Sequence, residues 1–367
     1  MRPYSIELCI LTSNIEYPGS RVLLCTIEHH QVSGGAKNVD KIFTGENRCD
    51  APGIREGNYQ FANHERDQTA LSREYMMNKI RIHVLTGLWD EYTLIDSGNT
   101  RKLERIGPYI IDREEPKAWW VPDRPKEIWA QSAAVQSRNG HWKLRKGTPR
   151  EWIVGFKSLV AEVKLTDTSR HVGIFPEQSP HWEWLMKKTA ADVSGSKNLL
   201  NLFGYTGMAT LAAVSAGYDV THVDASKPAM LWARRNAELS DLGHARIRWI
   251  LDDASKFVAR EVRRRSDYHG IVMDPPSFGR GPKGEIWKAE KKLNELMMEC
   301  RKLLEYRGEF LLITVYNLDI SALSLSNLMK DTFHGLGGVI DVGELALQQE
   351  GGDKILPRSI YARWERS

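Results

Sequence analysis

The chain has 367 residues, of which 41% are hydrophobic and 27% charged, with a mean hydropathy of −0.43. This composition excludes an integral membrane protein, a collagen and a largely disordered chain. The sequence contains 51 basic and 47 acidic residues, which gives a net charge of +4. Such a balance permits an anionic partner without requiring one.

No segment approaches the roughly 18 apolar residues that a membrane-spanning helix needs, and the first 20 residues make a poor signal peptide because Glu7 interrupts their short apolar stretch. We therefore expect a cytoplasmic protein with no membrane partner. The cysteines are widely spaced, with no CxxC pair and no metal-ligand spacing: Cys9, Cys25, Cys49 and Cys300. This pattern predicts reduced thiols and no bound metal.

Residues 1–75 show no sustained helical or strand periodicity and contain several polar clusters. We expect an extension of uncertain order here. Met76 and Met77 directly precede the first convincing strand, at 79–85, so we hypothesise that residues 1–75 are dispensable.

Residues 76–150 contain short strands separated by turns, which predicts a small β-rich domain. Six tryptophans fall in or just beyond it: Trp89, Trp119, Trp120, Trp129, Trp142 and Trp152. Such rings either stack on unpaired bases or, more often, fill a small core. The basic segments 101–105 and 143–150 fit either an RNA contact or solvated turns.

From residue 151 to 367 short apolar runs alternate with amphipathic stretches. The predicted strands are 198–203, 219–224, 247–251, 270–274 and 310–316, followed by two closing strands in VIDVGELAL and SIYARWE. The predicted helices are 208–216, 227–239, 254–265, 288–305 and 321–334. This order indicates a doubly wound α/β domain with a Rossmann-like sheet of seven strands.

Ligands of such sheets bind beyond the carboxyl ends of the strands. The first strand runs through Asn201 into the loop Phe203-Gly204-Tyr205-Thr206-Gly207, whose glycines allow a tight turn and a close ligand approach. The loop lacks the GxGxxG of dinucleotide-binding proteins and the lysine of a P-loop. A nicotinamide dehydrogenase is therefore a weak interpretation.

Carboxylates follow the next two strands. Asp224 ends the second strand, where it can accept hydrogen bonds from ribose hydroxyls, although an isolated carboxylate there is as often a helix cap. Asp252 and Asp253 end the third strand, and either of them can contact an adenine or cap the following helix.

The fourth strand ends in Asp274-Pro275-Pro276-Ser277-Phe278. The two prolines make a stiff turn whose carbonyls and Asp274 side chain can act as acceptors toward the cleft. Acceptors beside the Phe278 ring suit a flipped base that carries an N–H donor.

Together these motifs resemble a class I S-adenosylmethionine-dependent methyltransferase, of the group related to bacterial large-subunit ribosomal RNA methyltransferases. NLFGYTG, HVDAS, LDDAS and DPPSFGRGPKG carry the resemblance, with HVGIFPEQSPHW and the preceding β-rich segment. The family's first motif usually opens with an acidic residue, and Asn201 stands in that place.

The resemblance implies S-adenosylmethionine as the cofactor and assigns site residues. The cofactor-binding set is Phe175, Gln178, Asn201, Phe203, Gly204, Tyr205, Gly207, Asp224, Asp252 and Asp253. The residues expected at the reacting groups are Asp274, Pro275, Pro276 and Phe278.

The reaction itself needs no metal, because a sulfonium donor is discharged by in-line displacement. Methylation of a pyrimidine carbon would need a cysteine nucleophile. The fifth strand, where related enzymes place that cysteine, ends in Tyr316-Asn317. This favours a nitrogen, less so an oxygen, as the methyl acceptor.

A glycine-spaced loop with basic residues follows the proline turn. It suits a substrate-side lid, in which Arg280 and Lys283 position RNA phosphates and Trp287 stacks on a base, although a solvated loop has the same composition.

The favoured function is methylation of a base nitrogen in RNA, ribosomal RNA above all. The alternatives are a methyltransferase acting on protein, DNA or a small molecule, and an inactive binding protein with a methyltransferase-like domain. The sequence leaves the oligomeric state open.

Overall fold

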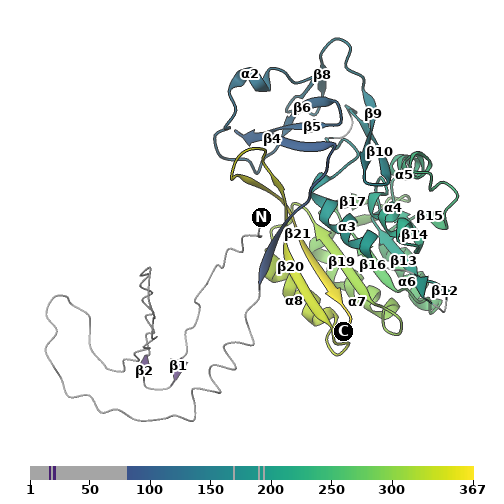
Figure 1. Cartoon of the computed structure of the whole chain (residues 1–367). Coiled ribbons are helices and arrows are strands. Elements are labelled where there is room, and N and C mark those ends of the chain that lie inside the picture. The colour runs from purple at the N-terminus through teal and green to yellow at the C-terminus, as the bar shows by residue number, and fades with distance from the viewer. Residues whose placement is uncertain (1–15, 18–19, 22–80, 168–169, 189–190, 193–194) are drawn as a thin grey trace, which may run out of the picture. The chain divides into compact units, whose positions relative to one another are not determined.

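The computed structural model describes residues 16–17, 20–21, 81–167, 170–188, 191–192 and 195–367 (Figure 1). Residues 80–367 form one compact unit. Of the predicted extension 1–75, only the two-residue strands β1 (Glu16–Tyr17) and β2 (Ser20–Arg21) are described. The expectation that this extension is dispensable lies outside the described residues and stays a prediction.

An eight-stranded sheet forms the centre of the larger unit, in the order β15-β14-β13-β16-β19-β21-β20-β3. The first five strands in this order, β15, β14, β13, β16 and β19, run parallel to one another. Strand β21 pairs antiparallel with both β19 and β20. The strands are β3 (Ile82–Thr86), β13 (Asn198–Leu202), β14 (Asp219–Asp224), β15 (Ile247–Leu251), β16 (Gly270–Met273), β19 (Phe310–Val315), β20 (Val339–Gln348) and β21 (Ile355–Glu365). The predicted doubly wound fold is confirmed.

Alternate residues of each central strand pack into two different cores. Leu199 of β13 joins a cluster with α3 and α4, whereas Leu200 joins a cluster with α6, α7 and α8. Helices therefore cover both faces of the sheet, which is why its strands are apolar on both sides (Figure 1). The helices are α3 (Ser179–Lys187), α4 (Met208–Ser215), α5 (Lys227–Leu239), α6 (Ala254–Arg263), α7 (Ala289–Leu303) and α8 (Ala322–Thr332).

Strand β3 is the eighth strand, one more than the seven predicted. It lies in the segment that the sequence assigns to the small β-rich domain, but it pairs parallel with β20. Gly343 of β20 permits this pairing, because a Cβ atom there would lie 2.0 Å from the carbonyl oxygen of His83. A local pattern of apolar residues identifies a strand but not its partner, and so the assignment of β3 to the small domain was wrong.

A five-stranded sheet precedes the catalytic region, in the order β4-β5-β6-β7-β8. Trp89 and Trp142 are buried in the hydrophobic cluster that also contains residues of α3 and α4, and filling a core is the more frequent of the two roles expected for these tryptophans. The small elements are β4 (Tyr92–Gly98), β5 (Arg101–Ile106), β6 (Tyr109–Glu114), α2 (Lys126–Trp129), β7 (Ala134–Gln136), β8 (Trp142–Leu144), and the hairpin strands β9 (Glu151–Phe156) and β10 (Leu159–Lys164). Five short elements complete the described chain: η1 (Pro176–Gln178), β11 (Ala191–Asp192), β12 (Gly195–Ser196), and β17 (Phe278–Arg280) with β18 (Ile286–Lys288), which form a hairpin.

The turn between β20 and β21 holds the five-stranded sheet. The Ser97 hydroxyl donates a hydrogen bond to Gln349 Oε1 at 2.8 Å, and the Glu350 N–H donates to the Leu94 carbonyl at 2.9 Å. Gln349 is buried at this junction. The small sheet is thereby attached to the last hairpin of the large sheet, on the side where the parallel strands end.

Candidate active site

A cavity of about 620 Å³ lies beyond the carboxyl ends of the parallel strands. Predicted site residues on its wall are Phe175, Phe203, Tyr205, Asp224, Asp252, Asp253, Asp274, Pro276, Phe278, Arg280 and Trp287. A smaller hollow of about 60 Å³ adjoins it and is lined by Gln178, Asn201, Gly204 and Gly207. Segments far apart in the sequence therefore meet at one place, as the strand order of the sheet requires.

Two predicted residues lie outside both hollows. Pro275 is buried within the turn between Asp274 and Pro276. The Lys283 side chain is exposed at the tip of the β17–β18 hairpin, where its backbone N–H donates to Glu285 at 2.8 Å.

The loop after β13 has an unusual backbone. Phe203 and Tyr205 have φ values of 56° and 48°, although neither is a glycine, and Gly207 has a φ of 88°. Left-handed conformations at non-glycine residues cost energy and concentrate at ligand-binding sites. The Tyr205 N–H donates to Asp224 Oδ2 at 2.8 Å, so this carboxylate holds the loop in place.

Gly204 is needed for packing. A Cβ atom there would lie 2.4 Å from Cε1 of the buried His222 ring, which packs directly beneath the loop. His222 Nδ1 in turn contacts Thr210 Oγ1 at 2.9 Å, and this hydroxyl accepts a hydrogen bond from the Asn201 amide at 2.8 Å. One N–H of the Asn201 amide is therefore engaged with helix α4, and no hydrogen bond to another described residue occupies its side-chain carbonyl oxygen.

We expect Gly204→Ala to weaken cofactor binding at least 10-fold and to lower thermal stability, because overpacking of a filled site costs about 1–3 kcal/mol. Calorimetric titration with S-adenosylmethionine and a thermal unfolding scan measure the two effects. Gly243→Ala is the matched control, since its Cβ would meet its nearest neighbour at an ordinary 3.6 Å. Wild-type affinity in Gly204→Ala would contradict this account of the loop.

The three carboxylates at the ends of β14 and β15 have distinct partners. Burial raises the pKa of Asp224, while the N–H groups of Ser226 and Tyr205 act in the opposite direction. Asp253 is the N-cap of α6, where it accepts from the Lys256 N–H at 2.9 Å. Asp252 forms an ion pair with Arg260. The sequence alone left open whether Asp252 and Asp253 cap the helix or face a ligand. In the structure Asp253 caps α6, and both residues line the cavity.

The proline turn is closed by the β17–β18 hairpin. The Trp287 indole N–H donates to the Pro276 carbonyl at 2.6 Å, and its ring centroid lies 4.9 Å from that of Phe203. Trp287 is 3% exposed. The indole of Trp287 therefore supports the turn, whereas the sequence suggested that this ring stacks on a base. The Pro276 carbonyl already accepts a hydrogen bond, whereas the sequence suggested a free acceptor. Phe278, by contrast, is 52% exposed at the cavity.

Asp274 is the central polar group of the cavity. Gln178 Nε2 donates to its Oδ2 at 3.2 Å, and Gln178 Oε1 accepts from the Thr314 hydroxyl at 3.4 Å. Withdrawal from solvent, with the nearby Glu177 carboxyl, raises the pKa of Asp274 to about 8, and the Gln178 hydrogen bond only partly offsets this. A carboxyl with a pKa near neutrality accepts or releases a proton readily at physiological pH.

Aromatic rings close the cavity beside Asp274. The Phe175 ring lies 5.6 Å from Tyr205 and 5.5 Å from Tyr316, measured between centroids. Cys300, the free cysteine of the described chain, is buried in α7, and burial raises the pKa of its thiol. Within the described residues, the cavity wall contains no cysteine.

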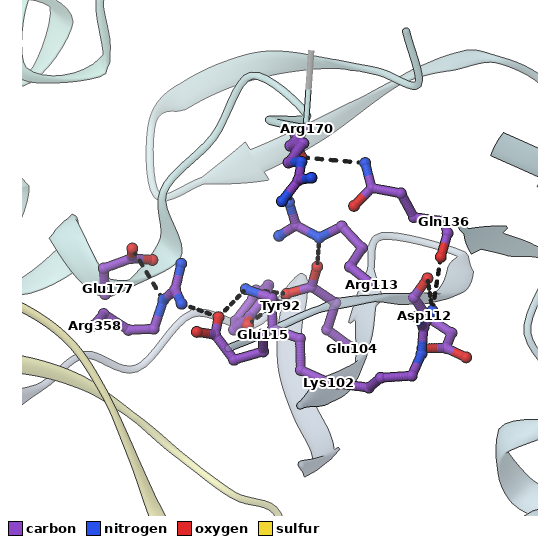
Figure 2. A network of polar contacts seen from close by, with 11 residues as sticks. Tyr92, Lys102, Glu104, Asp112, Arg113, Glu115, Gln136, Arg170, Glu177 and Arg358 are labelled. Carbon is purple, nitrogen blue, oxygen red and sulfur yellow. Dashed lines mark hydrogen bonds and ion pairs between the residues drawn. The ribbon is translucent and has the colours of Figure 1, made fainter. Parts of the chain in front are cut away.

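Residues of the small sheet form the far wall of the cavity. The sequence did not predict that this sheet contributes to the site. Lys102 of β5, Arg113 of β6 and Gln136 of β7 line it together with Arg358 of β21. These residues belong to a network of polar contacts, most of them between charged side chains (Figure 2). The sequence left RKLER at 101–105 open between an RNA contact and solvated turns. The structure buries Lys102 and Glu104, so the second interpretation was wrong for these two residues.

Glu104 is the centre of this network. It contacts the Arg113 guanidinium, the Lys102 ammonium at 3.3 Å and the Tyr92 hydroxyl at 2.9 Å. Burial opposes its ionisation, but Arg113 and Lys102 hold the pKa of Glu104 at about 2. Burial also lowers the pKa of Lys102, with the neighbouring arginines acting in the same direction.

Arg358 joins the network to the catalytic region (Figure 2). Its guanidinium pairs with Glu115, just beyond β6, and with Glu177 of η1, the latter at 3.3 Å. Gln178, the next residue in η1, holds Asp274. The small sheet is therefore connected by side chains to the carboxyl at the centre of the cavity.

Comparison with solved structures identifies the family. A crystal structure of a SAM-dependent methyltransferase from Agrobacterium tumefaciens superposes with a TM-score of 0.75 and 39% identity, over 78% of this chain and 94% of that one. The chain belongs to the S-adenosylmethionine-dependent methyltransferases. No protein-family model matches the sequence.

Curated relatives match this methyltransferase over only part of their own length. The ribosomal RNA large subunit methyltransferase K/L of Shewanella frigidimarina is 30% identical over 147 residues, which are 39% of this chain and 20% of the relative. The methyltransferase K of Neisseria meningitidis is 26% identical over 181 residues, 49% of this chain and 48% of the relative. The chain therefore spans about half or less of the curated relatives it matches.

The residues of the cavity fit S-adenosylmethionine, the cofactor of this family. Carboxylates at the ends of β14 and β15 suit the ribose and the adenine amino group, and aromatic walls beside Asp274 suit a sulfonium. The described part of the methyltransferase contains no cluster of His, Cys, Asp and Glu that could hold a metal ion. Nor does any helix described in it have the length and apolar character needed to cross a bilayer.

Proposed function

We propose that this methyltransferase transfers a methyl group to a nitrogen of a base in RNA, with ribosomal RNA as the favoured substrate. The observation that carries the proposal is the continuous cavity from Asp224, through Asp274, to the inner side chains of the small sheet. One end suits the cofactor, and the other end leaves room for an extruded base. The names of the curated relatives support RNA as the acceptor.

The roles follow from position in the cavity. Phe175, Tyr205 and Asp224 would hold the cofactor, whose sulfonium supplies the methyl group. Asp274 would accept a hydrogen bond from the target amino group and receive the proton released when that nitrogen is methylated, as its raised pKa allows. The exposed ring of Phe278 would stack on the base.

Basic residues at the cavity mouth would contact phosphates. Arg280 lines the cavity and Lys283 is exposed on the same hairpin, and the described chain places no carboxylate at ion-pair distance from either side chain. Unpaired cations beside a base pocket are suited to positioning an RNA backbone.

We expect the double substitution Arg280→Ala, Lys283→Ala to weaken RNA binding and to reduce the slope of log affinity against log salt by about 1.5, because two phosphate contacts are lost. Filter binding from low to moderate salt measures the slope. Arg307→Ala, Lys330→Ala is the matched control, since both residues are exposed and outside the cavity lining. An unchanged slope in the hairpin variant would exclude this phosphate contact.

Methyl transfer to ribosomal RNA isolated from a strain that lacks this gene tests the proposal. With labelled S-adenosylmethionine, we expect incorporation at one nucleotide, located by mass spectrometry of nuclease fragments. Labelling of protein, DNA or a small molecule under the same conditions would favour the alternative acceptors. Cofactor binding without transfer to any of them would favour a binding protein.

The division of the chain is part of the proposal. We infer an extension over 1–75, a small β-rich domain over 76–150 and a methyltransferase domain over 151–367, with β3 contributed to the sheet of the latter. The expected location is the cytoplasm, where ribosomal RNA substrates are found in bacteria.

A further inference from the structure

Trp119 differs from the other five tryptophans of the small domain region. It is 85% exposed, whereas the other five are buried or half-buried. A tryptophan exposed to this extent leaves a broad aromatic face open to solvent, and its position beside the cavity decides what this face can contact.

The indole is held in a fixed orientation. Its N–H donates to the Pro116 carbonyl at 2.6 Å, so that the single polar atom of the side chain is already satisfied. What remains for a partner is the flat apolar face. A rigid ring loses little conformational entropy when another ring stacks on it.

The loop that carries Trp119 is also fixed. Its neighbours Ala118 and Trp120 accept backbone hydrogen bonds from the β4–β5 turn, from Thr100 at 2.8 Å and from Asn99 at 2.7 Å. The Val121 carbonyl accepts from the Lys354 ammonium at 2.7 Å. The ring is thus presented by a well-braced segment rather than by a free chain.

This segment continues directly from the wall of the cavity. Glu115, Pro116 and Lys117 line the cavity, and Trp119 is hydrogen-bonded onto Pro116. Phe278 and Arg280 line the same cavity from the catalytic domain. Trp119 is not itself a lining residue of the cavity, but it lies two positions after Lys117, the last of the three in this segment that are.

We propose that Trp119 is a stacking platform for an unpaired nucleotide next to the methylated one. The inference rests on the proposed function, because it takes RNA as the substrate. Stacking is tolerant of sequence, since every base has a π-face, and therefore Trp119 contributes affinity and register without selecting the base.

The test compares Trp119→Ala, Trp119→Phe and Tyr306→Ala in full-length protein, with RNA affinity, KM, kcat and cofactor affinity as readouts. Trp119→Ala is expected to raise the Kd and KM for RNA about 5- to 100-fold, with unchanged cofactor affinity, and Trp119→Phe to recover part of the loss. Tyr306 is a comparably exposed ring (79%) outside the cavity lining, and its substitution is expected to have no effect.

An abasic nucleotide introduced beside the target identifies the stacked position. It is expected to weaken binding to the wild type as much as Trp119→Ala does, and to have no additional effect on the variant. If the wild type methylates RNA and Trp119→Ala binds it equally well, the platform is excluded while the proposed function stands. If the wild type neither binds nor methylates RNA, the proposed function itself fails, and an aromatic contact with a protein becomes the explanation for the exposed ring.

Discussion

Asp274→Ala is expected to lower kcat for methyl transfer by about 100-fold or more, while the affinity for S-adenosylhomocysteine stays within a few-fold of the wild type. In the proposed mechanism the substitution removes the acceptor that orients the target amino group and takes up its proton, a loss that raises mainly the free energy of the transition state. Single-turnover kinetics and calorimetric titration measure the two quantities. Asp331→Ala, an exposed position on α8, is the matched control.

The pH profile provides a second check on Asp274. Because its pKa is raised to about 8, the carboxylate needed as acceptor forms only as the pH rises through that value. We expect kcat/KM to increase between pH 7 and 9, and the step to disappear in Asp274→Asn. A profile without a step in this range, or the same step in the variant, would show that another group controls the reaction.

Glu104→Gln is expected to reduce the free energy of unfolding by about 3–5 kcal/mol, because it leaves two buried cations, Lys102 and Arg113, without their shared counterion. For a chain of this size the loss corresponds to a fall in Tm of about 10 °C. Thermal and urea unfolding measure it, with Glu127→Gln in α2 as an exposed control.

The pH dependence of this difference has a definite sign. The pKa of Glu104 is lowered to about 2 in the folded protein, below the ordinary value of 4.5. Its contribution is therefore fully present above about pH 4.5 and is lost as the pH falls toward 2. Acid should accordingly reduce the gap between wild type and Glu104→Gln, and a gap that widens in acid would contradict the assignment of the charge to Glu104.

The boundaries of the parallel strands and their helices were predictable because each signal is local. A buried strand such as Gly270–Met273 is a short apolar run, and an N-cap such as Ser226 precedes its helix directly. The order of these elements then determines the edge of the sheet at which ligands bind. For this reason most of the predicted residues, Asp224 and Asp274 among them, lie in one cavity.

Local patterns did not predict which partners the side chains have. Trp287 was expected to face a base, but the hairpin turns its indole toward Pro276. Lys102 and Glu104 have the appearance of an exposed turn, yet both are buried where β5 faces η1 and β21. Burial of a charge depends on counterions from distant segments, and no short stretch of sequence contains them.

By itself, then, the sequence determined the α/β order, the cofactor loop and the row of polar residues at the strand ends, since each depends on residues close together in the chain. Only the tertiary structure decided that β3 completes the large sheet, that Arg358 links the small sheet to η1, and that Trp119 alone among six tryptophans faces outward. These features depend on packing between segments more than 180 residues apart, or on the space left after the core is filled. Hydrophobic periodicity indicates which side of a helix or strand is buried, but it does not indicate which other element packs against that side.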